Sequence, residues 1–275
     1  MVSSTFLLIA FSLLSSTSNA ITPLPANEKW DYQIGEAYEP DPDVRVVTRD
    51  HTSTPVSGKY NICYINAFQT QPDEDAHKFW LDDPANNRLI LRNSSNLPYE
   101  DPDWPGEFYF NTTTDANRQA LATIVNGWID ECKRKGFNAI EPDNLDTFNR
   151  SSHLISKENN LDYAKLLADY AHNETNDLAF GQKNAGSELE GDGKREVGFD
   201  FAIAEECQAH NECKTYTNVY GNQVLEVEYF DEDAPENGRG NFTAACAERG
   251  SQISVIFRDH DVTAKGDPEY VYGEC

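Results

Sequence analysis

The sequence predicts an α/β fold, a (β/α)8 TIM-type barrel with one terminal strand to spare. Candidate strands and helices alternate along most of the chain, which is typical of a parallel sheet with right-handed crossovers. Several candidate strands are near-continuous apolar runs, as strands buried on both faces are. The length of 275 residues suits one closed barrel. An open doubly wound sheet is the rival architecture, but no G-x-G-x-x-G motif follows any candidate strand.

Nine segments have the pattern of strands, one more than the eight places of such a barrel. We expect one terminal strand to be an addition to the barrel. The strands are predicted over residues 30–35, 44–50, 61–68, 107–111, 138–144, 178–184, 199–207, 224–229 and 253–259.

The clearest helix is predicted between the fourth and fifth candidate strands. Apolar residues recur there at i, i+3 and i+4 from Leu121 to Cys132. Asp115 lies near its start and Gly136 follows its basic last turn, as at many helix ends. A second helix is predicted over residues 157–172, with Ser156 as its N-cap.

The charge balance narrows the choice of partners. Forty-seven Asp and Glu residues against 22 Lys and Arg residues give a net charge of −25. Such a field repels phosphate backbones and anionic lipid, so it argues against nucleic acid and membrane as partners. It would attract a polycation. The simpler alternative is an acidic surface that keeps a secreted protein soluble.

Residues 1–20 have the pattern of a secretory signal peptide. An apolar run from Phe6 to Leu14 is followed by the small-x-small sequence that ends at Ala20. The run is too short to span a bilayer as a helix. We therefore expect a secreted, extracellular monomer in which residues 21–275 form one catalytic barrel domain. Five N-x-S/T sequons, typical of a glycoprotein, begin at Asn93, Asn111, Asn149, Asn173 and Asn241.

The mature chain holds six cysteines, and an even number in a secreted chain indicates three disulfides. Cys207 and Cys213 are close enough in sequence to propose as a pair. A bond between Cys246 and Cys275 would anchor the C-terminus, which leaves Cys63 for Cys132. Zinc binding is the rival interpretation, but no C-x-x-C or Cys/His spacing supports it.

Carboxylates gather where the predicted strands end, which is where a barrel carries its function. Glu141 and Asp143 are two residues apart, so they share a face of their strand. Asp143 and a Glu at the end of the seventh candidate strand, Glu205 or Glu206, come from strands two apart and could face each other across the mouth. Paired carboxylates at such a place are the minimum equipment for glycoside hydrolysis. The alternative is that Glu141 or Glu205 only anchors Lys183 or an arginine in a buried ion pair.

Motifs for other chemistries are missing from the sequence. There is no G-x-S-x-G nucleophile elbow, no H-E-x-x-H zinc motif and no P-loop. The acidic segment Asp231-Glu232-Asp233 could bind calcium, but it lacks an EF-hand pattern, and a solvated loop is the alternative. We expect neither a metal nor a cofactor.

At the strand ends the sequence resembles glycoside hydrolase family 114, the endo-α-1,4-polygalactosaminidases related to spherulin-4-like proteins. The resemblance covers roughly residues 30–260 and is carried by the blocks YNICYINAF, KGFNAIEPDN, GQKN, FDFAIAEECQAHNEC and VLEVEY, in that order. It implies a (β/α)8 barrel that hydrolyses α-1,4-linked galactosamine polymers such as galactosaminogalactan. It also implies that the two catalytic carboxylates are Asp143, as nucleophile, and Glu205, as acid/base.

The chain departs from the family at the second block. The family usually has Asn-Glu-Gln-Cys there, whereas this chain has Ala204 and Glu206 on either side of Glu205. The spacing of Cys207 and Cys213 matches that of the family, which supports their disulfide.

Ten further residues are predicted to contact the sugar chain: Gln33, Tyr64, Asn66, Glu141, Asn144, Lys183, Asn184, Glu206, Glu228 and Tyr229. The expected partner is a cationic or partly N-acetylated galactosamine polysaccharide, with double displacement and retention as the favoured course. Two alternatives remain: a non-catalytic carbohydrate-binding or wall-associated protein on the same barrel, and a glycosidase for another α-linked sugar.

Overall fold

The computed structural model describes residues 21–230 and 235–275, and it is built on one nine-stranded sheet. The predicted signal peptide (1–20) and the acidic segment 231–233 lie outside the described residues. The strands are β1 (Trp30–Gln33), β2 (Val46–Asp50), β3 (Tyr60–Asn66), β4 (Ala139–Asp143), β5 (Ala179–Lys183), β6 (Phe201–Glu205), β7 (Val224–Tyr229), β8 (Ser254–Arg258) and β9 (Tyr272–Glu274).

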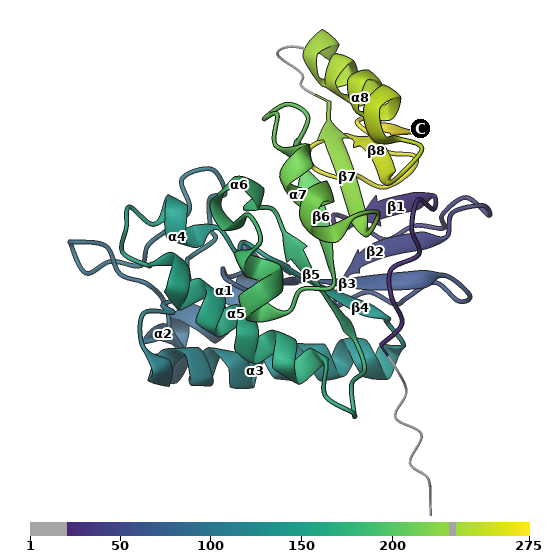
Figure 1. Ribbon diagram of the computed structural model, residues 1–275. Coiled ribbons are helices and arrows are strands. Elements are labelled where there is room, and N and C mark those ends of the chain that lie inside the picture. The colour runs from purple at the N-terminus through teal and green to yellow at the C-terminus, as the bar shows by residue number, and fades with distance from the viewer. Residues whose placement is uncertain (1–20, 231–234) are drawn as a thin grey trace, which may run out of the picture.

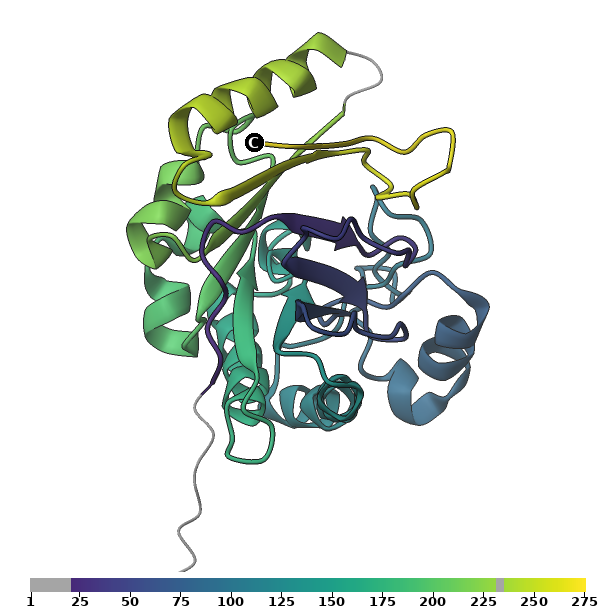
Figure 2. The same cartoon turned by 90° about the vertical axis from the view of Figure 1, so that its right-hand side faces the viewer.

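Strands β1 to β8 are parallel and follow one another in chain order, so the sheet curls into a TIM-barrel-like form (Figures 1 and 2). Strand β9 lies antiparallel on β8 as an extra terminal strand, but it is not one of the nine predicted segments. Side chains of β8 and β9 bridge the seam to β1. The Arg258 guanidinium donates to the carbonyl of Tyr32, and the Tyr272 hydroxyl donates to the carbonyl of Trp30 at 2.9 Å. The predicted barrel fold is confirmed.

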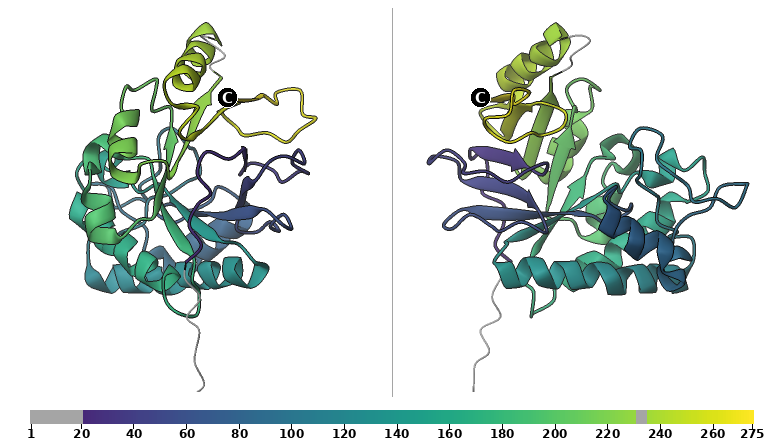
Figure 3. Two further views of the ribbon diagram at one scale, coloured as in Figure 1. Left: turned by 45° about the vertical axis from the view of Figure 1, so that its right-hand side comes forward. Right: turned by 180° about the vertical axis from the view of Figure 1, so that it is seen from behind.

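Helices cover the sheet unevenly (Figure 3). The two predicted helices are present, each with its N-cap, as α3 after Thr114 and α5 after Ser156. The helices are α1 (Glu74–His77), η1 (Lys78–Asp82), α2 (Pro84–Asn87), α3 (Asp115–Lys135), α4 (Thr147–Arg150), α5 (Lys157–Ala171), α6 (Gly186–Leu189), η2 (Gly193–Val197), α7 (Cys213–Tyr220) and α8 (Pro235–Arg249).

The structure departs from the predicted alternation of strands and helices in two ways. Loops, and no helix, join β1 to β2 and β2 to β3 within the described residues. The predicted strand over 107–111 is not part of the sheet. It forms isolated antiparallel bridges inside the long connection from β3 to α3, for example between Gln69 and Tyr109. Its run of aromatic residues does mark a pairing segment, but its partners are local. The short strand β9 was not predicted.

The core has two layers, as the alternation of side chains along parallel strands requires. Side chains such as Ile62, Ala139 and Leu225 fill the interior of the barrel. The residues between them, such as Ile140 and Phe180, pack outward against the helices. This parity decides which polar groups at the strand ends reach the mouth of the barrel.

The three disulfides connect Cys63 to Cys132, Cys207 to Cys213 and Cys246 to Cys275, which confirms the proposed pairing. Among the described residues, no helix combines the length and the apolar character that crossing a membrane would take.

Candidate active site

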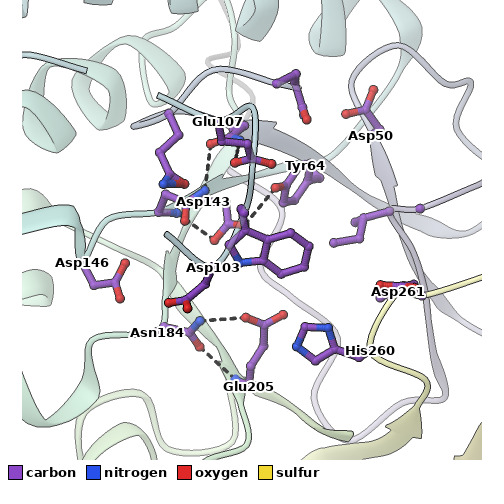
Figure 4. Close-up of a pocket in the computed structure, with 18 of the residues that line it drawn as sticks. Asp50, Tyr64, Asp103, Glu107, Asp143, Asp146, Asn184, Glu205, His260 and Asp261 are labelled. Carbon is purple, nitrogen blue, oxygen red and sulfur yellow. Dashed lines mark hydrogen bonds between the residues drawn. The ribbon is translucent and has the colours of Figure 1, made fainter. Parts of the chain in front are cut away.

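A cleft of about 1290 Å³ opens at the carboxyl ends of the strands (Figure 4). Its floor is made by the ends of β3, β4, β5, β6 and β7. One wall comes from the connection between β3 and α3, through residues such as Trp104 and Glu107, and the other from the loop after β8, through His260. The lining side chains include thirteen Asp or Glu residues and one arginine, Arg150.

The strands β4, β5 and β6 end in the same way. Each finishes on an inward-pointing charged side chain, and the residue that follows takes a left-handed backbone conformation. Such a conformation costs a non-glycine residue on the order of 1–3 kcal/mol, less for Asn, and it turns the chain sharply away from the barrel axis. The residues that follow the strands are Asn144, Asn184 and Glu206, with φ values of 68°, 50° and 53°.

Asp143 stands at the end of β4 and is held by two hydrogen-bond donors and one ammonium. The Tyr64 hydroxyl donates to Oδ2 at 2.8 Å, and the backbone N–H of Asn144 donates to Oδ1 at 2.7 Å. The Lys183 ammonium lies 3.5 Å from Oδ1. The Asp143 side chain is 17% exposed. Its carboxylate is therefore oriented by the protein and still reaches the cleft.

Glu205 stands at the end of β6, two strands away, and is held from both sides. The Asn184 side chain donates to Oε2 at 2.8 Å and accepts from the Glu205 backbone N–H at 2.9 Å. The Tyr229 hydroxyl donates to Oε1 at 2.6 Å. This carboxylate is likewise fixed in direction and partly open, with 23% of its side chain exposed.

Lys183, on β5 between these strands, lies beneath both carboxylates. Its side chain is only 1% exposed, and its ammonium lies 3.0 Å from Glu141 and 3.2 Å from Glu205. Burial lowers the pKa of this ammonium, but the carboxylates of Asp143, Glu205 and Glu141 outweigh burial and hold the pKa well above its usual range. A permanent positive charge therefore sits below the floor of the cleft.

Glu141 and Tyr32 complete the layer under the floor. The Tyr32 hydroxyl donates to Glu141 at 2.7 Å and accepts from Lys183 at 2.9 Å. Burial raises the pKa of Glu141 to about 7, although Lys183 opposes the shift. The ion pair that the sequence allowed for Glu141 and Lys183 is thus present, directly below the two exposed carboxylates.

The shared ammonium limits the separation of Asp143 and Glu205. It contacts one oxygen of each, at 3.5 and 3.2 Å, so these two oxygens lie at most about 6.7 Å apart. A sugar ring can therefore present its anomeric carbon to one carboxylate and its glycosidic oxygen to the other.

A sequence model of the glycoside-hydrolase family GH114 matches residues 12–275. The chain belongs to family GH114. A comparison with curated proteins found no match. Among solved structures, the chain is similar to a crystal structure of Aspergillus fumigatus Ega3 in complex with galactosamine, with a TM-score of 0.69, 22% identity and coverage of 94% of this chain and 100% of that one. It is also similar to the glycoside hydrolase domain of PelA from Pseudomonas aeruginosa, with a TM-score of 0.55, 13% identity and coverage of 87% and 97%.

As a GH114 member the chain is a glycoside hydrolase, and most of its predicted site residues meet at one place. Beside Asp143 and Glu205, six of the ten predicted sugar contacts line the cleft. They are Tyr64, Asn66, Asn144, Asn184, Glu206 and Tyr229.

The other four predicted contacts are buried and are not part of the cleft lining. Glu141 and Lys183 form the layer under the floor. Gln33 accepts from Arg49 at 2.9 Å, near the seam of the barrel. Glu228 points outward from β7 and accepts from the backbone N–H of Gln208 at 2.8 Å.

The family departures at positions 204 and 206 have different surroundings. Ala204 is fully buried in the outer core layer, so its side chain points away from the cleft. Glu206 lines the cleft and adds a carboxylate there. Of the two changes, only that at Glu206 alters the surface that a substrate would meet.

Sequence reasoning missed residues in the walls of this GH114 cleft, among them Trp104, Glu107 and His260. The indole of Trp104 stacks on His260 with ring centroids 5.5 Å apart, so the two walls meet across the cleft. The sequence Trp104-Pro105-Gly106 is a turn signal that could have placed Glu107 at a loop rather than at a strand start.

One buried cluster contains Cys and Glu residues of the kind that bind metal ions, but it lacks the thiolate ligands of such a site. Cys207, Cys213, Glu226 and Glu228 lie together behind β7. The two sulfurs are joined in a disulfide, so they offer no thiolate.

Proposed function

We propose that this glycoside hydrolase is a secreted, endo-acting enzyme that cleaves α-1,4-linked galactosamine polymers with retention. Asp143 is the nucleophile and Glu205 the acid/base. The observation that carries the proposal is the pair of oriented, partly exposed carboxylates above one buried ammonium, at the floor of a long acidic cleft.

In the first step the Asp143 carboxylate attacks the anomeric carbon while the bond to the leaving sugar breaks. Glu205 gives its proton to the leaving oxygen. In the second step Glu205 takes a proton from water, the water oxygen attacks the anomeric carbon, and the bond to Asp143 breaks. Tyr64 and Tyr229 hold the two carboxylates by their hydroxyl groups throughout.

The placement of the carboxylates is compatible with retention. Double displacement needs carboxyl groups about 5–5.5 Å apart, and inversion needs about 6.5–9.5 Å to admit a water. Lys183 limits one pair of oxygens of Asp143 and Glu205 to at most about 6.7 Å, which admits the shorter separation that double displacement needs.

The charge of the cleft supports an amine-bearing polymer as substrate. Thirteen carboxylate side chains line it against one arginine, and that arginine is already paired with Asp146 at 2.9 Å. An unacetylated galactosamine polymer is a polycation, which such a surface attracts and orients. The similar Ega3 structure holds galactosamine.

Secretion is supported by two features. Residues 1–20 have the pattern of a signal peptide, and three disulfides suit an oxidising compartment. Expression of the full chain in a eukaryotic host should therefore yield a glycosylated protein in the medium that begins near Ile21, as N-terminal sequencing would reveal.

The test is a product assay on partly deacetylated α-1,4-galactosaminan. The wild-type chain should release oligosaccharides, and Asp143→Asn and Glu205→Gln should each lower the rate on the order of 10³-fold or more. Asp169→Asn and Glu174→Gln are matched controls, because these exposed residues lie on α5 and in the turn after it. An α-anomer as the first product in NMR spectra would indicate retention.

The presence of Glu206 favours one alternative, a protein that binds the polymer without cleaving it. Binding of the polymer by the wild-type chain with no release of oligosaccharides would support this alternative. Glu206→Gln should then restore measurable release.

A further inference from the structure

Glu107 is a cleft carboxyl that the proposed mechanism leaves unused. It ends a tight turn in which its backbone N–H donates to the carbonyl of Trp104 at 3.1 Å. Pro105 and Gly106 occupy the central positions, and Gly106 has φ +93°, as a type II turn requires. The Glu100 side chain accepts from the Gly106 N–H at 2.8 Å. The turn is thus braced, and Glu107 is held on a defined backbone.

The side chain of Glu107 lies beside Asp143, on the side away from Glu205 (Figure 4). Its Oε2 accepts from the side chain of Asn66 at 2.9 Å. Asn66 pairs with Asp143 in the register of β3 and β4, and it accepts from the side chain of Asn144 at 2.8 Å. One rigid polar chain therefore ties Glu107 to the candidate nucleophile.

The other oxygen of Glu107 accepts no hydrogen bond from the described residues, and the side chain lines the cleft although only 9% of the residue is exposed. The nearby cation, Arg150, is bound instead to Asp101 and Asp146. Burying a carboxyl without a cationic partner is costly. A ligand that brings a positive charge would remove that cost.

We propose that Glu107 binds the C2 ammonium of the sugar whose anomeric carbon faces Asp143, and so selects for a deacetylated residue at the point of cleavage. This inference rests on the proposed function. C2 is bonded directly to the anomeric carbon, so its substituent lies next to the attacking carboxylate. An ammonium offers three donors and a charge to Glu107, whereas an acetamide offers one N–H and no charge.

Other carboxylates are placed less well for this role. Glu205 lies on the leaving-group side and is already bonded to Asn184 and Tyr229. Asp146 is paired with Arg150. Glu107, in the wall of the cleft, combines a buried place beside Asp143 with an oxygen that the described residues leave free.

The test measures binding, so that it does not depend on turnover. Calorimetry on the full chain carrying Glu205→Gln gives Kd for two probes, an α-1,4-galactosamine oligosaccharide and its fully N-acetylated form. Adding Glu107→Gln should raise Kd about tenfold or more for the amine probe and less than about twofold for the acetylated probe. Gln keeps the acceptor for Asn66, so the polar chain to Asp143 stays intact. Adding Glu174→Gln instead, an exposed site after α5, should leave both constants unchanged.

The outcomes separate the two proposals. Equal weakening for both probes, or weakening for neither, overturns the role of Glu107. If the chain without substitutions does not hydrolyse the polymer while the binding preference is present, the proposed activity is overturned. The role of Glu107 in binding the amine then stands. Failure of both probes to bind overturns both proposals. Glu107→Asp keeps the charge, so it should keep a preference for the amine probe, and this variant decides the matter if Glu107→Gln does not fold.

Measuring Kd for both probes over a range of pH adds a second test. A purely structural role of Glu107 predicts no change in the preference with pH. Burial raises the pKa of Glu107 to about 7, with Asp143 and Asp101 adding to the shift while Asn66 and Arg150 oppose it. As pH falls below about 7, Glu107 gains a proton and loses its charge. The preference for the amine probe should therefore shrink with falling pH when Glu107 is present, and the Glu107→Gln variant should lack this step.

Discussion

Replacing Lys183 with methionine removes the ammonium from the layer under the candidate active site. Glu141, which is fully buried, would lose its cationic partner and keep only the hydroxyl of Tyr32. Removing one member of a buried ion pair typically destabilises a protein by about 3–5 kcal/mol, because an uncompensated charge stays in the interior. We expect a loss of this size for Lys183→Met at pH 8, because Glu141 is ionised there in the wild type, with a pKa of about 7.

The loss should depend on pH with a definite sign. The pKa of Glu141 is already about 7 with Lys183 in place, and burial alone would raise it further in the variant. At pH 5 Glu141 is protonated in the folded variant, and the cost of the missing ammonium falls. The difference in unfolding free energy between wild type and Lys183→Met should thus grow as pH rises from 5 to 8.

The assay is urea unfolding at pH 5 and pH 8, with Glu141→Gln/Lys183→Met as the second variant. The double variant carries no buried charge at this place, so it should recover at least half of the stability lost at pH 8. A difference below about 1 kcal/mol at pH 8, or the same difference at both pH values, would refute the reasoning.

Three further predictions concern stability and substrate capture. Burial raises the pKa values of Glu107, Glu141 and Glu228 to about 7, so stability should fall as pH rises from 4.5 to 7.5, by on the order of 3 kcal/mol for each carboxyl. Thermal unfolding at several pH values checks this, and a flat or rising profile would contradict it. Replacing Cys246 and Cys275 with serine opens a loop of 29 residues and should cost about 3.6 kcal/mol in denaturant unfolding. Raising NaCl from about 0.05 to 0.5 M should weaken binding of a cationic galactosamine polymer several-fold, because salt screens exposed charges; unchanged binding would exclude electrostatic capture.

Local pattern was enough to predict the strands that build the floor. Apolar runs mark β3 to β8, and the charged residues that end β4, β5 and β6 follow such runs within three positions. Strand parity then put Glu141 and Asp143 on one face, as the structure has them. Once the order of parallel strands is known, these inferences need no tertiary information, because side chains alternate with a period of two.

The same two-residue period also shows what local pattern cannot predict. Glu228 and Tyr229 are neighbours on β7, so they cannot both face the cleft, yet both were predicted to contact sugar. Tyr229 points inward to Glu205, while Glu228 points outward. Which of the two faces inward depends on the register of β7 against its neighbouring strands, and this is a property of the assembled sheet.

The sequence by itself determined the barrel, its disulfides and the two carboxylates that the family resemblance singled out. The tertiary structure decided what surrounds them. It placed the segment at Glu107 in the wall of the cleft instead of in the sheet, and it brought Lys183 under Asp143 and Glu205. The physical reason is that strands and helices follow from short-range periodicity, whereas a binding site is made by contacts between segments far apart in the chain, which no local pattern records.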